Sequence, residues 1–260
     1  IYDEWPKIAR KSFELEEESI NFKNIDHIVF AGMGGSGALG DVFAAILSKI
    51  NIHVTVVKGY ILPKTVDSKT LVITTSVSGN TIETLTILKS AMNLSCKIIS
   101  FSSGGKMEDF CKKNKVKYKK ISFFHSPRAS FVSFLFSMLK ILKNITKIKN
   151  QDIIECIECL ENTQKKISTK NLIKNNPAVE LAEWLTEVPI IYYPHGLESS
   201  AIRFKNSLQE NAKMHVITEN VVEACHNGIV AWEKKSKLKP IFIKGEKDYI
   251  KTIERWEILK

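Results

Sequence analysis

The sequence predicts an α/β protein built from parallel sheets. Between residues 26 and 120 one pattern recurs: a short apolar run, a turn rich in Gly or Ser, then a segment of helical periodicity. Short buried strands that alternate with helices are typical of parallel sheets. From about residue 189 the same pattern returns more weakly. We therefore expect two domains, residues 1–148 and 149–260, each a parallel sheet flanked by helices, with the polar segment 144–151 as linker.

The first half of the chain contains the clearer elements. Its apolar, β-branched runs predict strands, and the segments after its Gly and Ser turns predict helices. The expected strands are residues 28–31, 52–57, 71–75, 97–101 and 116–119. The expected helices are residues 38–50, 82–92, 107–113 and a long one from Pro127 to about residue 143.

The second half contains fewer strands. Helices are expected at residues 152–168, at 177–185 with Pro177 in the first turn, and at 201–212. Strands are expected at residues 189–193, 214–218 and 240–244. The chain begins at Ile1 and stops at Lys260 within a helix-like pattern, so we expect the second domain to be incomplete at its C-terminus.

Composition excludes several classes of protein. A chain of 260 residues with 44% hydrophobic and 25% charged residues is not disordered. The net charge is +10, but only four of the 38 basic residues are Arg, the side chain that nucleic-acid readers prefer, so no nucleic-acid partner is expected. The longest apolar run, residues 131–142, is too short to span a membrane. Five cysteines and a charged first turn favour a cytoplasmic protein.

A glycine-rich turn follows the first expected strand. Gly32-Met-Gly-Gly-Ser-Gly37 formally matches the dinucleotide-binding pattern. The next strand, however, leads into Lys58-Gly59 rather than the acidic residue that would bind a ribose. Two other interpretations stay open: a tight turn without a ligand, or glycines that let a small ligand approach while Ser36 donates a hydroxyl.

A second turn carries a stronger signal. Ser76-Val-Ser-Gly-Asn-Thr81 lies between an expected strand and an expected helix, where three hydroxyls and free backbone N–H groups face the positive end of a helix dipole. This arrangement predicts a binding site for a phosphate monoester. The alternative is that the hydroxyls only cap the helix, although one cap needs one hydroxyl.

Other candidate motifs are weak. Cys156 and Cys159 lie within an expected helix without a second pair, and the six histidines lack metal-binding spacing, so no metal is expected. The lysines of residues 112–120 suit a charged sheet edge that blocks strand pairing better than an RNA-binding patch.

Taken together, these motifs resemble a known family. The glycine turn (32–37), Ser-x-Ser-Gly-Asn-Thr-x-Glu-Thr (76–84) and Ser-Pro-Arg-Ala (126–129) resemble the sugar isomerase (SIS) domain. Gln-Glu-Asn-Ala-Lys (209–213) and Glu-Ala-Cys-His-Asn (223–227) resemble catalytic segments of the archaeal-type bifunctional phosphoglucose/phosphomannose isomerases, which consist of two SIS domains. The resemblance implies tandem SIS domains of the αβα type.

The resemblance also implies roles for eight residues. In the first domain, Gly35 and Ser36 would contact the sugar, and Arg128 would lie beside the reacting carbons. The phosphate would be bound by three hydroxyl side chains, those of Ser76, Ser78 and Thr81.

In the second domain, Glu210 would act as the catalytic base, and His226 would assist ring opening. In this family the histidine reaches the active site of a partner subunit, which implies a homodimer.

The implied reaction interconverts glucose 6-phosphate, and mannose 6-phosphate, with fructose 6-phosphate. A proton moves between C1 and C2 through an enediolate, so one carboxylate above both carbons suffices as base. Arg128 would stabilise the developing negative charge, and a histidine can open the sugar ring near neutral pH. No metal or organic cofactor is required.

Two functions remain open beside this one: a sugar-phosphate-binding module without turnover, and an isomerase of another phosphorylated sugar. Family members also use a lysine and a pocket threonine near their C-terminus. Neither can be assigned here, and neither Lys251 nor Lys260 is assigned the lysine's role. The sequence does not decide between the glucose and mannose epimers.

Overall fold

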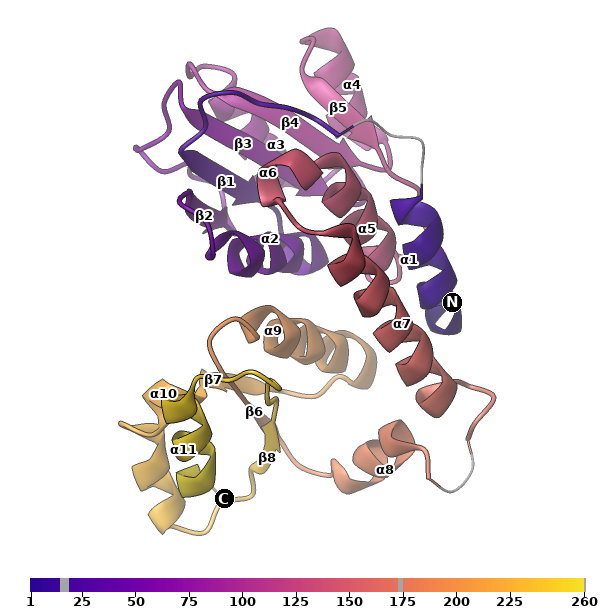
Figure 1. Cartoon of the computed structure of the whole chain (residues 1–260), viewed down its shortest axis with the longest axis vertical. Helices are drawn as coiled ribbons and strands as arrows, with labels where there is room; N and C mark the ends of the chain where they lie inside the picture. The colour runs from indigo at the N-terminus through magenta and orange to yellow at the C-terminus, as the bar shows by residue number, and fades with distance from the viewer. Residues whose placement is uncertain (15–18, 173–174, 260) are drawn as a thin grey trace. The chain divides into compact units, whose positions relative to one another are not determined.

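The computed structural model describes residues 1–14, 19–172 and 175–259. The chain divides into two compact units, Ile1–Ile173 and Lys174–Lys260, each with its own sheet. Both sheets are parallel and flanked by helices, which confirms the predicted α/β class (Figure 1).

The first unit is built on a five-stranded sheet in the order β2-β1-β3-β4-β5. β3 lies at its centre and is buried along its whole length, because helices cover both faces. The expected strands are all present, with ends shifted by at most one residue. Their bounds are β1 His27–Ala31, β2 His53–Val57, β3 Thr70–Ser76, β4 Lys97–Ser102 and β5 Lys117–Lys120.

Helices cover the two faces of this sheet unequally. On one face α1, α2, α5 and α7 bury the larger cluster of apolar side chains, and α3 and α4 cover the other. A short 3₁₀ turn, Tyr2–Glu4, precedes the first helix. The helices are α1 Trp5–Phe13, α2 Gly34–Leu47, α3 Ile82–Ala91, α4 Gly105–Lys113, α5 Phe131–Ile141, α6 Lys143–Thr146 and α7 Asn150–Ile167.

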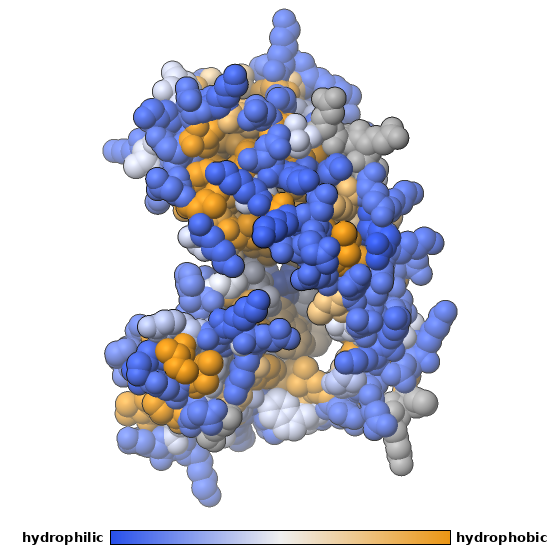
Figure 2. Space-filling model, in the orientation of Figure 1, coloured by the Kyte–Doolittle hydropathy of each residue, from blue (hydrophilic) through white to orange (hydrophobic). Residues whose placement is uncertain are grey.

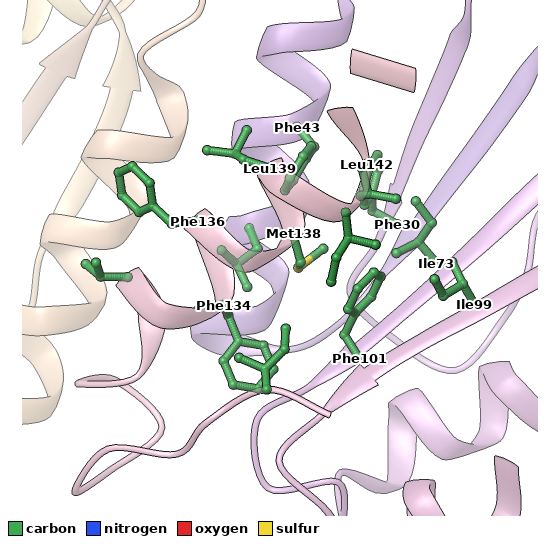
Figure 3. Packing of buried hydrophobic residues seen from close by; sticks show 14 of the residues in the cluster. Phe30, Phe43, Ile73, Ile99, Phe101, Phe134, Phe136, Met138, Leu139 and Leu142 are labelled. Atoms are coloured by element: carbon green, nitrogen blue, oxygen red, sulfur yellow. The ribbon is translucent and has the colours of Figure 1, made fainter. Parts of the chain in front are cut away.

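The main core lies between α2, α5 and the sheet. Figure 3 shows Phe30 and Phe43 from β1 and α2 meeting Met138 of α5, with Phe101 of β4 beside them. The rings of Phe30 and Phe43 stack with centroids 5.2 Å apart. Burying one such side chain contributes about 1.5–3 kcal/mol. This packing holds α2 and α5 against one face of the sheet.

Two expectations for the middle of the chain need correction. The long helix expected from Pro127 begins only at Phe131, because residues 127–130 form a turn held by the Ser130 hydroxyl, which accepts the Phe124 N–H and donates to the Ser126 carbonyl. The segment 144–151, expected as a linker, contributes to α6 and α7. Because Arg10 of α1 pairs with Glu161 of α7 at 2.7 Å, α7 belongs to the first unit, and the division of the chain falls after α7 rather than at 148/149.

The second unit contains a three-stranded sheet in the order β7-β6-β8. Tyr192 of β6 is buried among Val221, Ala224 and Trp256, and its hydroxyl accepts a hydrogen bond from Trp232 Nε1 at 3.0 Å. The elements are α8 Pro177–Trp184, β6 Pro189–Tyr193, α9 Glu198–Ser207, β7 Ile217–Asn220, α10 Val221–Ala224, a 3₁₀ helix Gly228–Glu233, β8 Lys239–Phe242 and α11 Ile250–Leu259.

Two elements of this unit differ from the prediction. The helix expected at 201–212 starts earlier, as α9, and its last five residues, Leu208–Ala212, form a π-helical turn. This turn ends at Lys213 in the left-handed region (φ 58°), so the chain enters the sheet later than expected and β7 replaces the strand expected at 214–218.

Hydrophilic residues dominate the face of the molecule shown in Figure 2. Among the helices that the structure describes, none is both long and apolar enough to cross a membrane.

A buried histidine lies at the amino end of the first sheet. His27 is 6% exposed, its Nε2 lies 3.0 Å from Thr55 Oγ1, and its ring is 4.8 Å from that of His53. Burial, helped by the charge on His53, lowers the pKa of His27 below 6.5, although Asp67 and Asp26 act in the opposite sense. The fold therefore favours the neutral imidazole.

Stability of the first unit should consequently depend on pH. Below about pH 6.5 the unfolded chain takes up a proton that folded His27 resists, so the free energy of unfolding should fall as pH falls through this range. Urea unfolding at pH 7.5 and 5.5 should show a smaller pH difference for His27→Gln than for the wild type. His125→Asn is the control, because His125 is exposed and Asn tolerates its φ of 55°. An identical pH difference in His27→Gln and the wild type would contradict this assignment.

Candidate functional site

The glycine turn and the serine loop follow neighbouring strands. β1 and β3 pair in register from His27↔Thr70 to Ala31↔Thr74, so residues 32–37 and 76–81 emerge at the same edge of the sheet. After β1 the chain moves outward to β2, whereas after β3 it moves the other way to β4. In open parallel sheets ligands bind in the crevice at such a reversal of strand order. The topology thus places both sequence motifs where a ligand is expected.

The glycine turn forms the start of α2. The helix begins at Gly34, whose φ is 53°. A Cβ on Gly32 would lie 2.9 Å from the Thr75 carbonyl oxygen, so the turn approaches the end of β3 as closely as backbone allows. A Cβ on Gly35 would meet nothing within 4 Å, which leaves open space beside Gly35 and the half-buried Ser36.

The serine loop is ordered by its own hydroxyls. Ser76 Oγ accepts the Gly79 N–H at 3.1 Å and lies 2.9 Å from Thr81 Oγ1. Ser78 Oγ accepts the Asn80 N–H at 3.2 Å. Ser76 is 1% exposed, whereas Ser78 is exposed. Ser76 therefore shapes the loop from inside, and Ser78 presents its hydroxyl to solvent.

These contacts bear on the capping alternative. Thr81 is the N-cap residue of α3, yet within the described residues its side chain makes no capping hydrogen bond. Its hydroxyl faces Ser76 instead. The first turn of α3 thus receives no side-chain cap from the loop, and its N–H groups and positive dipole end remain oriented toward the sheet edge. Simple capping does not account for the three hydroxyls.

A third loop, which no sequence motif connects to the site, supports the serine loop. Asn80 Oδ1 accepts the Lys106 N–H at 3.1 Å, and the Gly79 carbonyl accepts the Met107 N–H at 2.9 Å. Gly79 has φ 69°, and a Cβ there would lie 1.7 Å from the Gly104 carbonyl oxygen. The Ser-Ser-Gly-Gly sequence at 102–105 was the available signal, but its contact with residues 79–80 depends on the pairing of β3 with β4.

The end of β2 matters for the dinucleotide alternative. An acidic residue there would bind a ribose, but the position is occupied by Lys58, whose Nζ lies 2.6 Å from Asp41 Oδ2. The residues around the glycine turn therefore do not reproduce the dinucleotide pattern.

Arg128 lies in the turn between β5 and α5 and is partly buried. Trp5 of α1 donates its Nε1 hydrogen to the neighbouring Ala129 carbonyl at 2.9 Å, and the Ala129 N–H is directed to Ser126 Oγ at 3.3 Å. Trp5 thus supports this turn across 124 positions of sequence, a contact that local patterns could not reveal.

Glu210 lies in the second unit, within the π-helical turn Leu208–Ala212, and is exposed. Lys213 Nζ donates to the Glu210 carbonyl at 2.7 Å, which closes the turn. Single π turns are rare and occur frequently at functional sites. The π turn therefore falls on the segment that the sequence motif also indicated, residues 209–213.

His226 is exposed and follows α10. Its neighbour Asn227 donates from Nδ2 to Glu223 Oε1 at 3.1 Å. Glu219 of β7 lies nearby in the fold, with its carboxylate oxygens 2.9 and 3.0 Å from where a Cβ on Gly228 would be. Burial, reinforced by the charge of Glu223, raises the pKa of Glu219.

The predicted site residues are therefore distributed over both units. The first brings Gly35 and Ser36 to the same sheet edge as the serine loop, and the second holds Glu210 before β7 and His226 after it. The described residues contain no group of three or more His, Cys, Asp or Glu side chains able to bind a metal ion.

Comparison with known proteins matches both parts of the chain. Residues 21–126 match the SIS domain, and residues 174–260 match the bacterial phospho-glucose isomerase C-terminal SIS domain. A bifunctional phosphoglucose/phosphomannose isomerase of Caldicellulosiruptor bescii is 32% identical over 98% of this chain and 79% of its own length. This chain belongs to the bifunctional phosphoglucose/phosphomannose isomerase family. The chain is thus a phosphosugar isomerase of the SIS type.

Other relatives include a second isomerase of this family, an epimerase and a solved structure of similar fold. The Aquifex aeolicus member of this isomerase family is 28% identical over 95% of this chain and 76% of its own length. A D-glucosamine-6-phosphate 4-epimerase of Sulfolobus acidocaldarius is 27% identical over 95% of this chain and 77% of its own length. Among solved structures, the C-terminal domain of a Francisella tularensis glucosamine-fructose-6-phosphate aminotransferase has a TM-score of 0.73 at 16% identity, covering 99% of this chain and 78% of its own. That likeness shows the shared fold.

The contact between Gly79 and Gly104 yields a prediction. Gly79→Ala should lower the free energy of unfolding of the first unit. A side chain at φ 69° costs about 1–3 kcal/mol in backbone strain, and the collision of its Cβ with the Gly104 carbonyl adds to this cost. Gly59→Ala should leave the melting temperature nearly unchanged, since a Cβ there meets nothing within 4 Å. Thermal unfolding followed by circular dichroism measures both; equal melting temperatures for the two variants would show that the loop is not locked in this way.

Proposed function

We propose that this phosphosugar isomerase interconverts glucose 6-phosphate and mannose 6-phosphate with fructose 6-phosphate. The observation that carries the proposal is the serine loop at the reversal of strand order, in a chain of the bifunctional isomerase family. The sugar phosphate is the small-molecule partner.

Phosphate binding is assigned to Ser76, Ser78 and Thr81. The exposed Ser78 hydroxyl can donate directly to a phosphate oxygen, and the start of α3 adds N–H groups and a positive dipole end. The mutual hydrogen bond of Ser76 and Thr81 keeps their hydroxyls preoriented. Gly35 and Ser36, at the same sheet edge, are assigned to the sugar.

The base is assigned to Glu210. Its carboxylate removes the proton from C2 of an aldose and returns it to C1, which requires no cofactor. The π turn gives this residue a direction that a continuous α-helix would not, because the extra residue in the turn rotates the helix surface.

Arg128 and His226 complete the assignment. A guanidinium stays protonated at any working pH and stabilises the negative charge of the enediolate. His226 is proposed to assist ring opening. In the proposed homodimer its side chain reaches the partner subunit's site, and its exposure leaves it available for that role.

A cytoplasmic setting is proposed for this reaction. All five cysteines are free, which suits a reducing compartment.

Glu210→Gln tests the assignment of the base. The amide keeps the shape of the side chain but cannot take up the proton, so turnover of fructose 6-phosphate should fall by about 10²–10⁴-fold. A coupled assay for glucose 6-phosphate measures the rate. The matched control is Glu233→Gln, an exposed carboxylate in the 3₁₀ helix Gly228–Glu233. Near wild-type turnover by Glu210→Gln would remove Glu210 from this role.

The epimerase among the relatives supports one alternative, a different phosphorylated sugar as substrate. A substrate panel separates the possibilities. Fructose 6-phosphate should be converted to both epimeric aldoses, whereas glucosamine 6-phosphate should be left unchanged. Conversion of glucosamine 6-phosphate alone would favour the alternative, and thermal stabilisation by sugar phosphates without any turnover would indicate a binding module.

A further inference from the structure

The connection from β2 to β3 crosses the sheet without a helix. It begins with Lys58-Gly59-Tyr60, which we call the strap. The strap leaves the carboxyl end of β2 next to the glycine turn, because the Gly32 N–H donates to the Val57 carbonyl at 3.2 Å. The strap therefore starts at the edge of the sheet that carries the candidate site.

Lys58 contacts the start of α2. Its Cγ and Cε atoms each lie 3.2 Å from where a Cβ on Gly37 would be, so its stem runs along the first turn of that helix. Its Nζ then pairs with Asp41 Oδ2 at 2.6 Å, and the Asp41 side chain is only 14% exposed. One side chain thus joins the end of β2 to the first two turns of α2.

Tyr60 contacts the start of α3. Its hydroxyl donates to Glu83 Oε1 at 3.2 Å, and Glu83 lies in the first turn of α3. The hydrogen bond and the charge of Glu83 raise the pKa of Tyr60, which keeps the phenol protonated as a donor. Tyr60 itself is 54% exposed, so its ring adds little to the core.

Two side chains of one three-residue segment therefore attach to two different helix starts. The start of α2 carries Gly35 and Ser36, and the start of α3 follows Thr81. We propose that the strap sets the separation of these two turns, with Lys58 and Tyr60 as positioning residues that adjust the site to a sugar phosphate rather than to phosphate alone. This inference rests on the proposed function, since it deepens the assignment of the same site.

The proposal separates two ligands. Inorganic phosphate needs only the serine loop, whereas fructose 6-phosphate must reach both turns. Loosening the strap should therefore weaken binding of the sugar phosphate and leave binding of inorganic phosphate unchanged. A contribution to stability alone would alter neither affinity.

Tyr60→Phe is the main variant, because it removes one exposed hydroxyl and nothing else. Lys58→Met combined with Asp41→Asn is the second, since removing Lys58 alone would leave the largely buried Asp41 carboxylate unpaired. Tyr249→Phe is the matched control for an exposed tyrosine hydroxyl, at 73% exposure in the second unit. Lys69→Met with Asp26→Asn is the control for an ion pair, exposed and 3.4 Å long, at the opposite edge of the sheet.

Isothermal titration of the full chain with fructose 6-phosphate and with inorganic phosphate measures both affinities. Each strap variant should bind fructose 6-phosphate about two- to tenfold more weakly, the range expected for one lost hydrogen bond, with unchanged phosphate affinity. In turnover assays KM should rise while kcat stays close to the wild-type value. The controls should match the wild type in every measurement.

The outcomes distinguish the strap from the proposed function. If the wild type binds both ligands and the strap variants bind fructose 6-phosphate equally well, the strap does not position the site. Equal weakening of both ligands would also overturn the proposal, because it would show a general disturbance of the fold. A wild type that binds neither ligand would overturn the proposed function and the role of the strap with it.

Discussion

The candidate site depends on a close contact between two loops at the carboxyl ends of β3 and β4. Gly79 and Gly104 meet there at a separation that leaves no room for a side chain, and Asn80 ties the same loop to the first turn of α4. With its backbone held in this way, the serine loop can keep Ser76 inside and Ser78 outside. In the proposed site, such preoriented hydroxyls would need little further ordering when a phosphate binds.

The charge of the chain has a smaller part in this recognition. The protein carries a formal net charge of +10, but several lysines near the first sheet are engaged in surface ion pairs, such as Lys112 and Lys120 with Glu108. Exposed charges of this kind are screened at cellular salt. They would provide at most a mild attraction for sugar phosphates, whereas the proposed site assigns the direction and distance of phosphate binding to hydroxyls and to the start of a helix.

The second unit also has irregular backbone at a candidate residue. Its π turn interrupts the end of α9 where the sequence carries Gln-Glu-Asn-Ala-Lys, and the left-handed Lys213 ends it. Such a turn lacks the regular hydrogen bonds of an α-helix. Its backbone and the resemblance of the same segment to a catalytic motif therefore point independently to Glu210.

The sequence alone determined the α/β class, every strand of the first unit and the two turns that carry the candidate site. These features are local: apolar runs, glycines and hydroxyls act within a few residues of one another. Three features were misplaced. The start of α5 depends on the hydrogen bonds of Ser130, and the strand after Glu210 depends on the left-handed conformation of Lys213. The division between the units depends on the pairing of Arg10 with Glu161. Only the tertiary structure decided that Gly79 touches Gly104, that Trp5 supports the turn of Arg128, and that Lys58 and Tyr60 reach two helix starts. Contacts of this kind join residues distant in sequence, and they follow from the order of strands in the sheet, which no local pattern encodes.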